Sequence, residues 1–174
     1  MNSINNLGML LRQMGQLEEA RALFEEALQA QRETLGDRNP STLDSINNMA
    51  TLLATMGQLE EARLLHEEVL QEQRETLGDR HKHTLLSISN LGSLLLAMSQ
   101  LDKAKPLFEE ALQARRETLG NRHPDTLLSI NNMGSLLYAM GQLEINNMGQ
   151  LVEAMPLLEE ARALLEEALQ AQRA

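Results

Sequence analysis

The apolar residues of this 174-residue chain form two alternating stripes, and each stripe has the spacing of one face of an α-helix. A short stripe comes first, a glycine interrupts the pattern, and a longer stripe follows. Over residues 1–41 the stripes are Ile4, Leu7, Gly8, Leu11 and Met14, and then Leu17, Ala20, Leu23, Phe24, Ala27 and Leu28. The pattern predicts a helix, a tight turn and a longer helix that ends near Gly36, because glycine readily takes the left-handed conformation of a helix C-cap.

This helix pair recurs at a fixed interval of 42 residues. Two independent strings mark the interval: Ser-Ile-Asn-Asn or Ser-Ile-Ser-Asn from Ser3, Ser45, Ser87 and Ser129, and Arg-Glu-Thr-Leu-Gly from Arg32, Arg74 and Arg116. Internal repeats of this length are typical of a solenoid, in which each unit packs on its neighbours. The chain is therefore predicted to be a single repeat domain over residues 1–174, with units 1–41, 42–83, 84–125 and 126–174.

The last unit departs from the period. Its second-helix sequence resumes at Glu160, 15 residues late, after an insertion near residues 145–159. The small residues Ala154, Ala161 and Ala168 then follow at a spacing of seven, which keeps them on one helix face. This spacing predicts one terminal helix of about 22 residues.

Two single positions also depart from the repeat. His66 takes the place of Phe24, and a partly buried imidazole is expected there. Ser99 takes the place of the glycine that interrupts the pattern in the other units, Gly15, Gly57 and Gly141. These three glycines are expected in the turns between paired helices.

The small residues indicate which helical repeat this is. Gly8, Ala50, Gly92 and Gly134 share one position in the first helix, and Ala20, Ala62 and Ala104 share one in the second. A glycine in mid-helix costs about 1 kcal/mol relative to alanine, so close approach of the paired helix is the expected reason for it. Leu7-Gly8, Leu11, Ala20, Phe24 and Ala27 together resemble the signature of the tetratricopeptide (TPR) repeat.

The 42-residue unit is similar to the TPR repeats of kinesin light chains. The resemblance implies an all-α fold, a right-handed superhelical solenoid of antiparallel helix pairs with about four repeats. HEAT and armadillo repeats have compatible lengths, but they do not predict the recurring glycine and alanine positions. The resemblance also implies a scaffold for protein binding.

The charge and composition of the chain limit the classes of partner and the location that can be expected. The net charge is −10 and no run of lysine and arginine interrupts the acidic surface, so neither a nucleic acid nor a membrane is expected as a partner. No stretch approaches the roughly 18 apolar residues of a membrane span, and the N-terminus has no apolar signal region, so a cytoplasmic location is expected. The lack of cysteine suits a reducing compartment.

No enzyme activity, cofactor or metal is predicted. Glutamate pairs such as Glu18–Glu19 recur on the outer face of every second helix, whereas a catalytic pair would be single and partly buried. The cluster His81-Lys82-His83 lies in a loop between repeats, where the preceding loop has Asn39-Pro40-Ser41. Two loop histidines around a lysine make a weak metal site.

A binding surface is expected on the side of each first helix that faces away from its apolar stripe. The resemblance assigns this side to the concave groove of the solenoid. The predicted peptide-binding residues are Asn5, Asn6, Met9, Arg12, Asn47, Asn48, Thr51, Ser89, Asn90, Ser93, Asn131, Asn132, Ser135 and Tyr138. An asparagine amide can both donate and accept, so it can pair with the main chain of an extended peptide. The alternative is that these amides join neighbouring helices.

Two functions follow from these observations. The first is a protein–protein interaction scaffold that binds an extended peptide or partner segment in the groove, the partner itself being unidentified. The second is a homo-oligomer without a dedicated ligand, in which copies stack end to end or swap through the C-terminal helix, residues 150–173. This helix carries the leucine pairs Leu157–Leu158 and Leu164–Leu165, which are expected to be exposed.

Overall fold

The computed structural model describes residues 2–148 and 151–173, and all regular secondary structure in these ranges is α-helical. The helices are α1 (Asn2–Gln13), α2 (Leu17–Leu35), α3 (Pro40–Thr55), α4 (Leu59–Leu77), α5 (Lys82–Ala97), α6 (Leu101–Leu119), α7 (Pro124–Met148) and α8 (Leu151–Arg173). Short first helices alternate with longer second helices up to α6, as the two stripes predict. The all-α fold class is confirmed.

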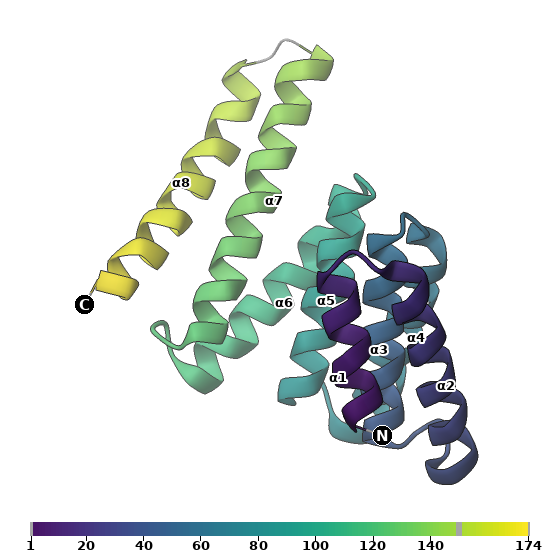
Figure 1. The fold of residues 1–174 in the computed structure, drawn as a ribbon. Helices are drawn as coiled ribbons and strands as arrows, with labels where there is room; N and C mark the ends of the chain where they lie inside the picture. Colours follow the sequence, from purple (N-terminus) through teal and green to yellow (C-terminus); the bar gives the residue numbers. More distant parts are fainter. Residues whose placement is uncertain (1, 149–150, 174) are drawn as a thin grey trace. The chain divides into compact units, whose positions relative to one another are not determined.

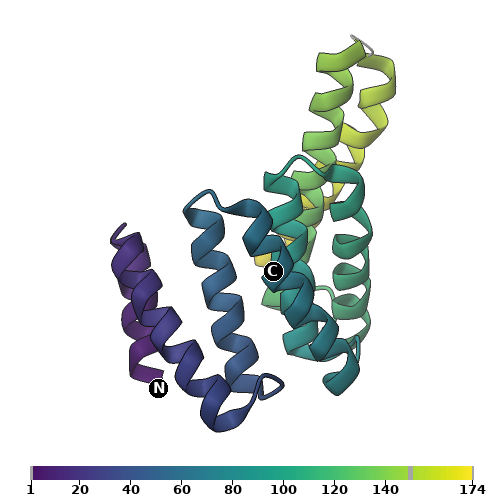
Figure 2. The ribbon, with the colours of Figure 1, turned by 90° about the vertical axis from the view of Figure 1, so that its right-hand side faces the viewer.

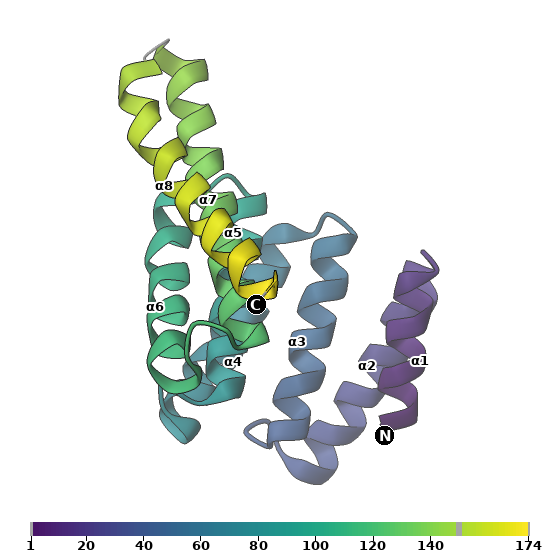
Figure 3. The ribbon, with the colours of Figure 1, turned by 90° about the vertical axis from the view of Figure 1, so that its left-hand side faces the viewer.

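The helices form two compact units, Met1–Asp79 and Arg80–Ala174. In the first unit α1 packs on α2, α2 on α3, and α3 on α4 (Figure 3). Figure 2 shows the antiparallel course of the first two helices, in purple and indigo. In the second unit α5 packs on α6, α6 on α7, and α7 on α8 (Figure 1). Within each unit, helices that follow one another in sequence are therefore neighbours in space, as in stacked helix pairs.

Side-chain caps and a glycine define the boundaries between pairs. Asn39 caps α3, since its side chain accepts a hydrogen bond from the backbone N–H of Ser41 at 3.0 Å, and Pro40 occupies the first turn. Gly36 ends α2 with φ +85°, so the expected positive φ is confirmed, but its ψ of 163° lies outside the left-handed helical region. Ser99 has φ +58°, a conformation that usually costs a residue with a Cβ atom free energy.

The recurring mid-helix glycines allow an aromatic ring to approach the first helix. A Cβ atom on Gly8 would lie 2.7 Å from Cε1 of Phe24, and a Cβ atom on Gly92 would lie 2.7 Å from Cε1 of Phe108. Both rings are fully buried. The close approach expected from the sequence is therefore confirmed, and a side chain at either glycine would push the ring out of its place.

The prediction that Gly141 lies in a turn between paired helices is wrong. Gly141 lies inside α7, which continues to Met148 and has 25 residues, whereas α5 has 16. A Cβ atom on Gly141 would lie 2.8 Å from Cδ2 of Leu158, just as one on Gly134 would lie 3.0 Å from Cδ2 of Leu165. Gly141 therefore repeats the helix contact of Gly134 one heptad further along the chain.

The predicted long terminal helix is confirmed, since α8 has 23 residues. The insertion lengthens both helices of the last pair, because the contact steps by seven residues on each of them. In Figure 1, α7 and α8 run side by side along this longer pair. Residues 149–150, part of the inserted segment, lie outside the described residues.

Candidate functional site

The fifth position of the first three repeats (Asn5, Asn47 and Ser89) belongs to the scaffold. Asn5 donates from Nδ2 to Oγ of Ser45 at 2.8 Å and so joins α1 to α3. Asn47 is buried, with its Oδ1 3.0 Å from Nδ1 of His66. Ser89 is also buried and accepts a hydrogen bond from Arg115. Asn47 and Ser89 therefore do not present their side chains to a ligand, contrary to the expectation that both line a groove.

His66 is more deeply buried than expected, with 2% of its surface exposed. Burial lowers the pKa of its imidazole to about 4, because the charged form loses its water. The ring is neutral at pH 7 and its Nδ1–H donates to Asn47. The pair replaces the glycine–phenylalanine contact of the neighbouring repeats, since Ala50 stands in place of Gly8 and a phenylalanine ring would not fit against its Cβ atom.

Arg115 is a buried cation that sequence reasoning missed. It occupies the position that Gln31 holds in the first repeat, and only 4% of it is exposed. Its guanidinium donates to Oγ of Ser129 at 2.6 Å and to Oγ of Ser89 at 3.1 Å. It also donates to the backbone oxygens of Leu85 and Asp125. Burial lowers the pKa of Arg115, although the nearby Asp125 acts in the opposite direction.

The sixth position of every repeat faces outward. Its four asparagines are exposed or half-buried, and their side-chain amides form no hydrogen bond with another described residue: Asn6, Asn48, Asn90 and Asn132. Other predicted groove residues are exposed or half-buried as well, namely Met9, Arg12, Thr51, Ser93, Asn131, Ser135 and Tyr138. The repeats thus offer a set of amides that the fold itself does not use.

Four of the predicted residues meet in one polar hollow of the first unit. The hollow has a volume of about 190 Å³ and lies between α1, α2 and α3. Its walls are Asn5, Asn6, Met9 and Asn48, together with Gln31, Ser41 and Asp44, which the sequence did not indicate. The hollow is lined by amides, one hydroxyl and one carboxylate, so it offers both donors and acceptors and one negative charge to a polar ligand.

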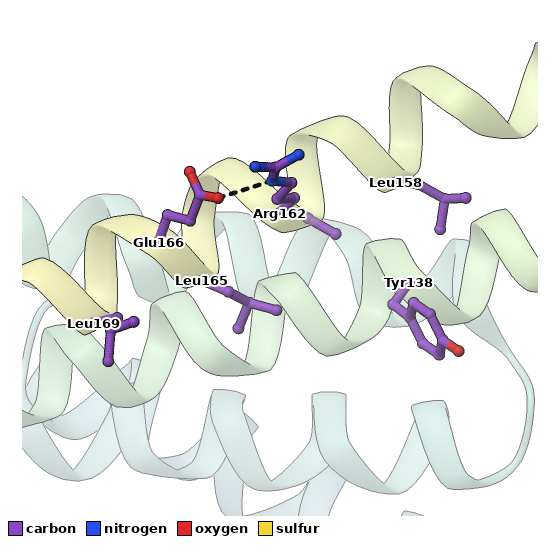
Figure 4. A pocket seen from close by; sticks show the side chains of 7 residues that line it. Tyr138, Leu158, Arg162, Leu165, Glu166 and Leu169 are labelled. Carbon is purple, nitrogen blue, oxygen red and sulfur yellow. Dashed lines mark hydrogen bonds and ion pairs between the residues drawn. The ribbon is translucent and has the colours of Figure 1, made fainter.

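Tyr138 belongs to a different surface, an apolar hollow of about 480 Å³ between α7 and α8. Figure 4 shows Tyr138 of α7 beside this hollow and Leu158, Leu165 and Leu169 projecting from α8. At its outer edge Arg162 pairs with Glu166 at 2.8 Å, one turn apart on α8. This surface suits an apolar partner rather than a peptide main chain.

The remaining charged groups that the structure describes lie mostly at the surface of the helices. Carboxylates such as Glu25 and Glu67 form exposed ion pairs one turn away on their own helices, with Arg21 and Arg63. The described residues contain no group of three potential metal ligands from His, Cys, Asp and Glu. The rings of His81 and His83 stack with centroids 5.4 Å apart, and His81 caps α5. None of the helices described is both long and apolar enough to cross a membrane.

Comparison with known proteins connects these features to a family. A sequence model of the tetratricopeptide repeat matches residues 1–75, 45–112 and 83–145. A kinesin-light-chain-like protein of Podosopora anserina with nearly identical TPR-like repeats is similar in structure, with 27% identity, a TM-score of 0.77 and coverage of 98% of this chain and 94% of the other.

BtubC (BKLC) of P. vanneervenii has a similar fold at 19% identity, with a TM-score of 0.78 over 98% of this chain. This chain spans 62% of the length of BtubC. No curated protein matched the chain.

Proposed function

Because the chain belongs to the tetratricopeptide-repeat family, whose repeats generally mediate protein–protein interaction, we propose that it binds an extended peptide segment of a protein partner. The binding residues are the outward-facing residues of the first helices α1, α3, α5 and α7. Each of the two compact units has two such helices, and each unit binds peptide on its own outward face.

The main support for this proposal is that the amides of the sixth-position asparagines form no hydrogen bond with another described residue. Asn48 and Asn90 are half-buried, so their amides are held by packing but still reach solvent. An extended peptide has an unpaired N–H and C=O at almost every residue, and an amide side chain can pair with both. The fifth position is already occupied by contacts within the scaffold, such as Asn5 with Ser45. In the first three repeats the side-chain hydrogen bonds of the fifth position therefore serve the fold, while the sixth-position amide remains free for the ligand.

The charge of the surface indicates what kind of peptide fits. The chain has a net charge of −10, and Asp44 lines the polar hollow. Arg12 is the only cation among the predicted binding residues. An acidic segment or a free C-terminal carboxylate would meet few positive groups, whereas a neutral or basic segment would meet acceptors and negative charge.

We predict that replacing Asn48 and Asn90 together by alanine weakens peptide capture without lowering helicity. Neither amide bonds to a described residue, so the fold loses no hydrogen bond. Each bond to the ligand contributes about 0.5–1.5 kcal/mol, so the loss of one amide should weaken peptide capture by each unit roughly two- to tenfold. A peptide array identifies a ligand for the unaltered chain, and fluorescence anisotropy then compares the two proteins.

The matched control is Asn47→Ala. Asn47 is the neighbour of Asn48 in sequence, but its amide is buried against His66. This variant should lower the unfolding midpoint and leave affinity unchanged at temperatures where it is folded. Unchanged binding by the Asn48→Ala, Asn90→Ala double variant would contradict the proposal, and so would a loss of stability equal to that of Asn47→Ala.

The apolar hollow of α8 favours a second candidate function, association between copies of this chain. Leu169 is 45% exposed, whereas Leu28, Leu70 and Leu112, which hold the same position in the other second helices, are at most 9% exposed. If α8 docks on another copy, Leu169→Lys should shift a dimer or larger oligomer to monomer, because a charge would be buried. Light scattering tests this, and a monomeric unaltered chain across micromolar concentrations would refute it.

A further inference from the structure

The polar hollow of the first unit contains oxygen atoms that lack hydrogen-bond donors. Gln31 is 2% exposed, and its Oε1 has no partner among the described residues. The Oδ1 of Asn5 is also buried without a partner, while its Nδ2 is already used by Ser45. A buried carbonyl oxygen without a donor raises the free energy of the folded state. Both residues line the hollow, so rotation of these side chains would turn the two oxygens toward a ligand that brings several N–H groups.

In the third repeat, the chain's own side chain at the position of Gln31 carries several N–H groups. Arg115 stands where Gln31 stands in the first repeat, and its guanidinium is buried between Ser89 of α5 and Ser129 of α7. The residues that correspond to these two serines around Gln31 are Asn5 of the first repeat and Ser45 of the second. The third repeat thus shows that this arrangement of first helices can enclose a guanidinium group.

The first repeat has no guanidinium group of its own at this position. Gln31 is shorter than arginine and carries no charge, and a hollow of about 190 Å³ lies beside it. The hollow also contains Asp44, a carboxylate that can balance a positive charge. The terminal torsion of a glutamine side chain turns with little resistance, so Oε1 of Gln31 can rotate toward a donor in the hollow.

We infer that this hollow binds the guanidinium group of an arginine side chain, supplied by the peptide that the chain captures. The inference rests on the proposed function for the source of the arginine, whereas the chemistry of the site rests on Gln31, Asn5 and Asp44 alone. A planar guanidinium offers five donors in a fixed arrangement, which suits a wall made of several separate acceptors. A lysine ammonium offers three donors at one point and satisfies fewer of them. A carboxylate would be repelled by Asp44.

The site can be tested without knowing the partner. The full chain, labelled with ¹⁵N, is titrated with Nα-acetyl-arginine amide while the side-chain amide signals of Asn5 and Gln31 are followed by NMR. Saturable shifts at both residues are expected. The citrulline analogue has the same shape without the charge and should bind about tenfold more weakly or worse, because charge-assisted hydrogen bonds are the stronger ones. Nα-acetyl-lysine amide is titrated in the same way. Equal binding of the citrulline or lysine compound, or no saturation by the arginine compound, would overturn the inference.

Two variants of α2 supply a matched comparison. Gln31→Arg copies Arg115 and places the protein's own guanidinium in the hollow, so binding of the arginine probe should be lost while helicity stays the same. Gln29→Arg adds the same charge on the exposed side of α2, where Gln29 pairs with Glu33, and should keep probe binding. Probe binding that survives Gln31→Arg would show that the probe binds elsewhere.

The outcomes also separate this inference from the proposed function. If peptide capture depends on Asn48 and Asn90 but the arginine probe never saturates, the peptide-binding proposal stands and the guanidinium site is wrong. If the probe saturates but captured peptides bind Gln31→Arg as tightly as the unaltered chain, the hollow does not receive an arginine of the peptide. Tighter binding of peptides with arginine than of the same peptides with citrulline, lost in Gln31→Arg, supports the whole inference.

Discussion

Acidification from pH 7 to pH 4 is expected to destabilise the fold by about 3 kcal/mol through His66 alone, since its pKa is lowered to about 4. An unfolded chain holds the same imidazole in water, where its pKa is about 6.5. Between these two values the unfolded state binds the proton more readily than the folded state does. The contribution of His66 is therefore fully present above pH 6.5, falls as the pH drops through this window, and is lost below about pH 4.

Urea unfolding followed by circular dichroism at a series of pH values measures the effect. The control is His66→Asn, which removes the titrating ring but keeps a neutral N–H close to the position of Nδ1, next to Asn47. This variant should be less stable at pH 7 and should lose less stability on acidification, because the carboxylates contribute equally to both proteins. An identical pH dependence of the two proteins between pH 6.5 and pH 4 would contradict the assigned cause.

Replacing Phe108 by alanine is expected to cost about 3–5 kcal/mol of unfolding free energy, the largest effect predicted for a single side chain. The ring is 1% exposed and lies against Gly92, which has no side chain to fill the space that the ring would leave. The cavity would therefore remain open between α5 and α6. Denaturant unfolding of the variant and the unaltered chain gives the difference in free energy.

Phe108→Leu is the matched control, because Leu165 packs against Gly134 in the last pair and shows that leucine is compatible with this contact. Its loss should be smaller, about 1.5 kcal/mol or less. A loss below about 1 kcal/mol for the alanine variant would mean that the ring contributes little to holding α5 and α6 together.

Much of the fold could be predicted because it depends on local pattern. Helical spacing and the 42-residue interval predict the helix pairs, and the mid-helix glycines predict the contacts of Gly8 with Phe24 and of Gly92 with Phe108. Gly141 could not be assigned by the same reasoning, since a glycine in a turn and a glycine at a helix contact look alike in sequence. What decides between them is Leu158, which lies opposite Gly141 only when both helices are lengthened together.

The candidate site was less predictable, because adjacent residues of one helix have different neighbours. Asn5 and Asn6 are the same residue type, 100° apart around α1, and both were expected to face a ligand. A serine of the next repeat, Ser45, holds Asn5 inside, and nothing comparable holds Asn6. Arg115 could not be predicted as buried for a related reason. An arginine is normally expected at the surface, and only its partners on α5 and α7 show that this one is buried.

The contacts of the α7–α8 pair also imply a rule for how such proteins can change in length. Adding seven residues to each of the two helices moves the far end of the pair outward by about 10 Å, while the same helix faces continue to meet. Seven residues added to one helix alone would change which residues lie opposite each other, so that Gly134 and Gly141 would no longer both face Leu165 and Leu158. Unequal crossing-over between near-identical repeats can therefore produce pairs of different reach, in paired steps of a heptad, as well as arrays with different numbers of pairs.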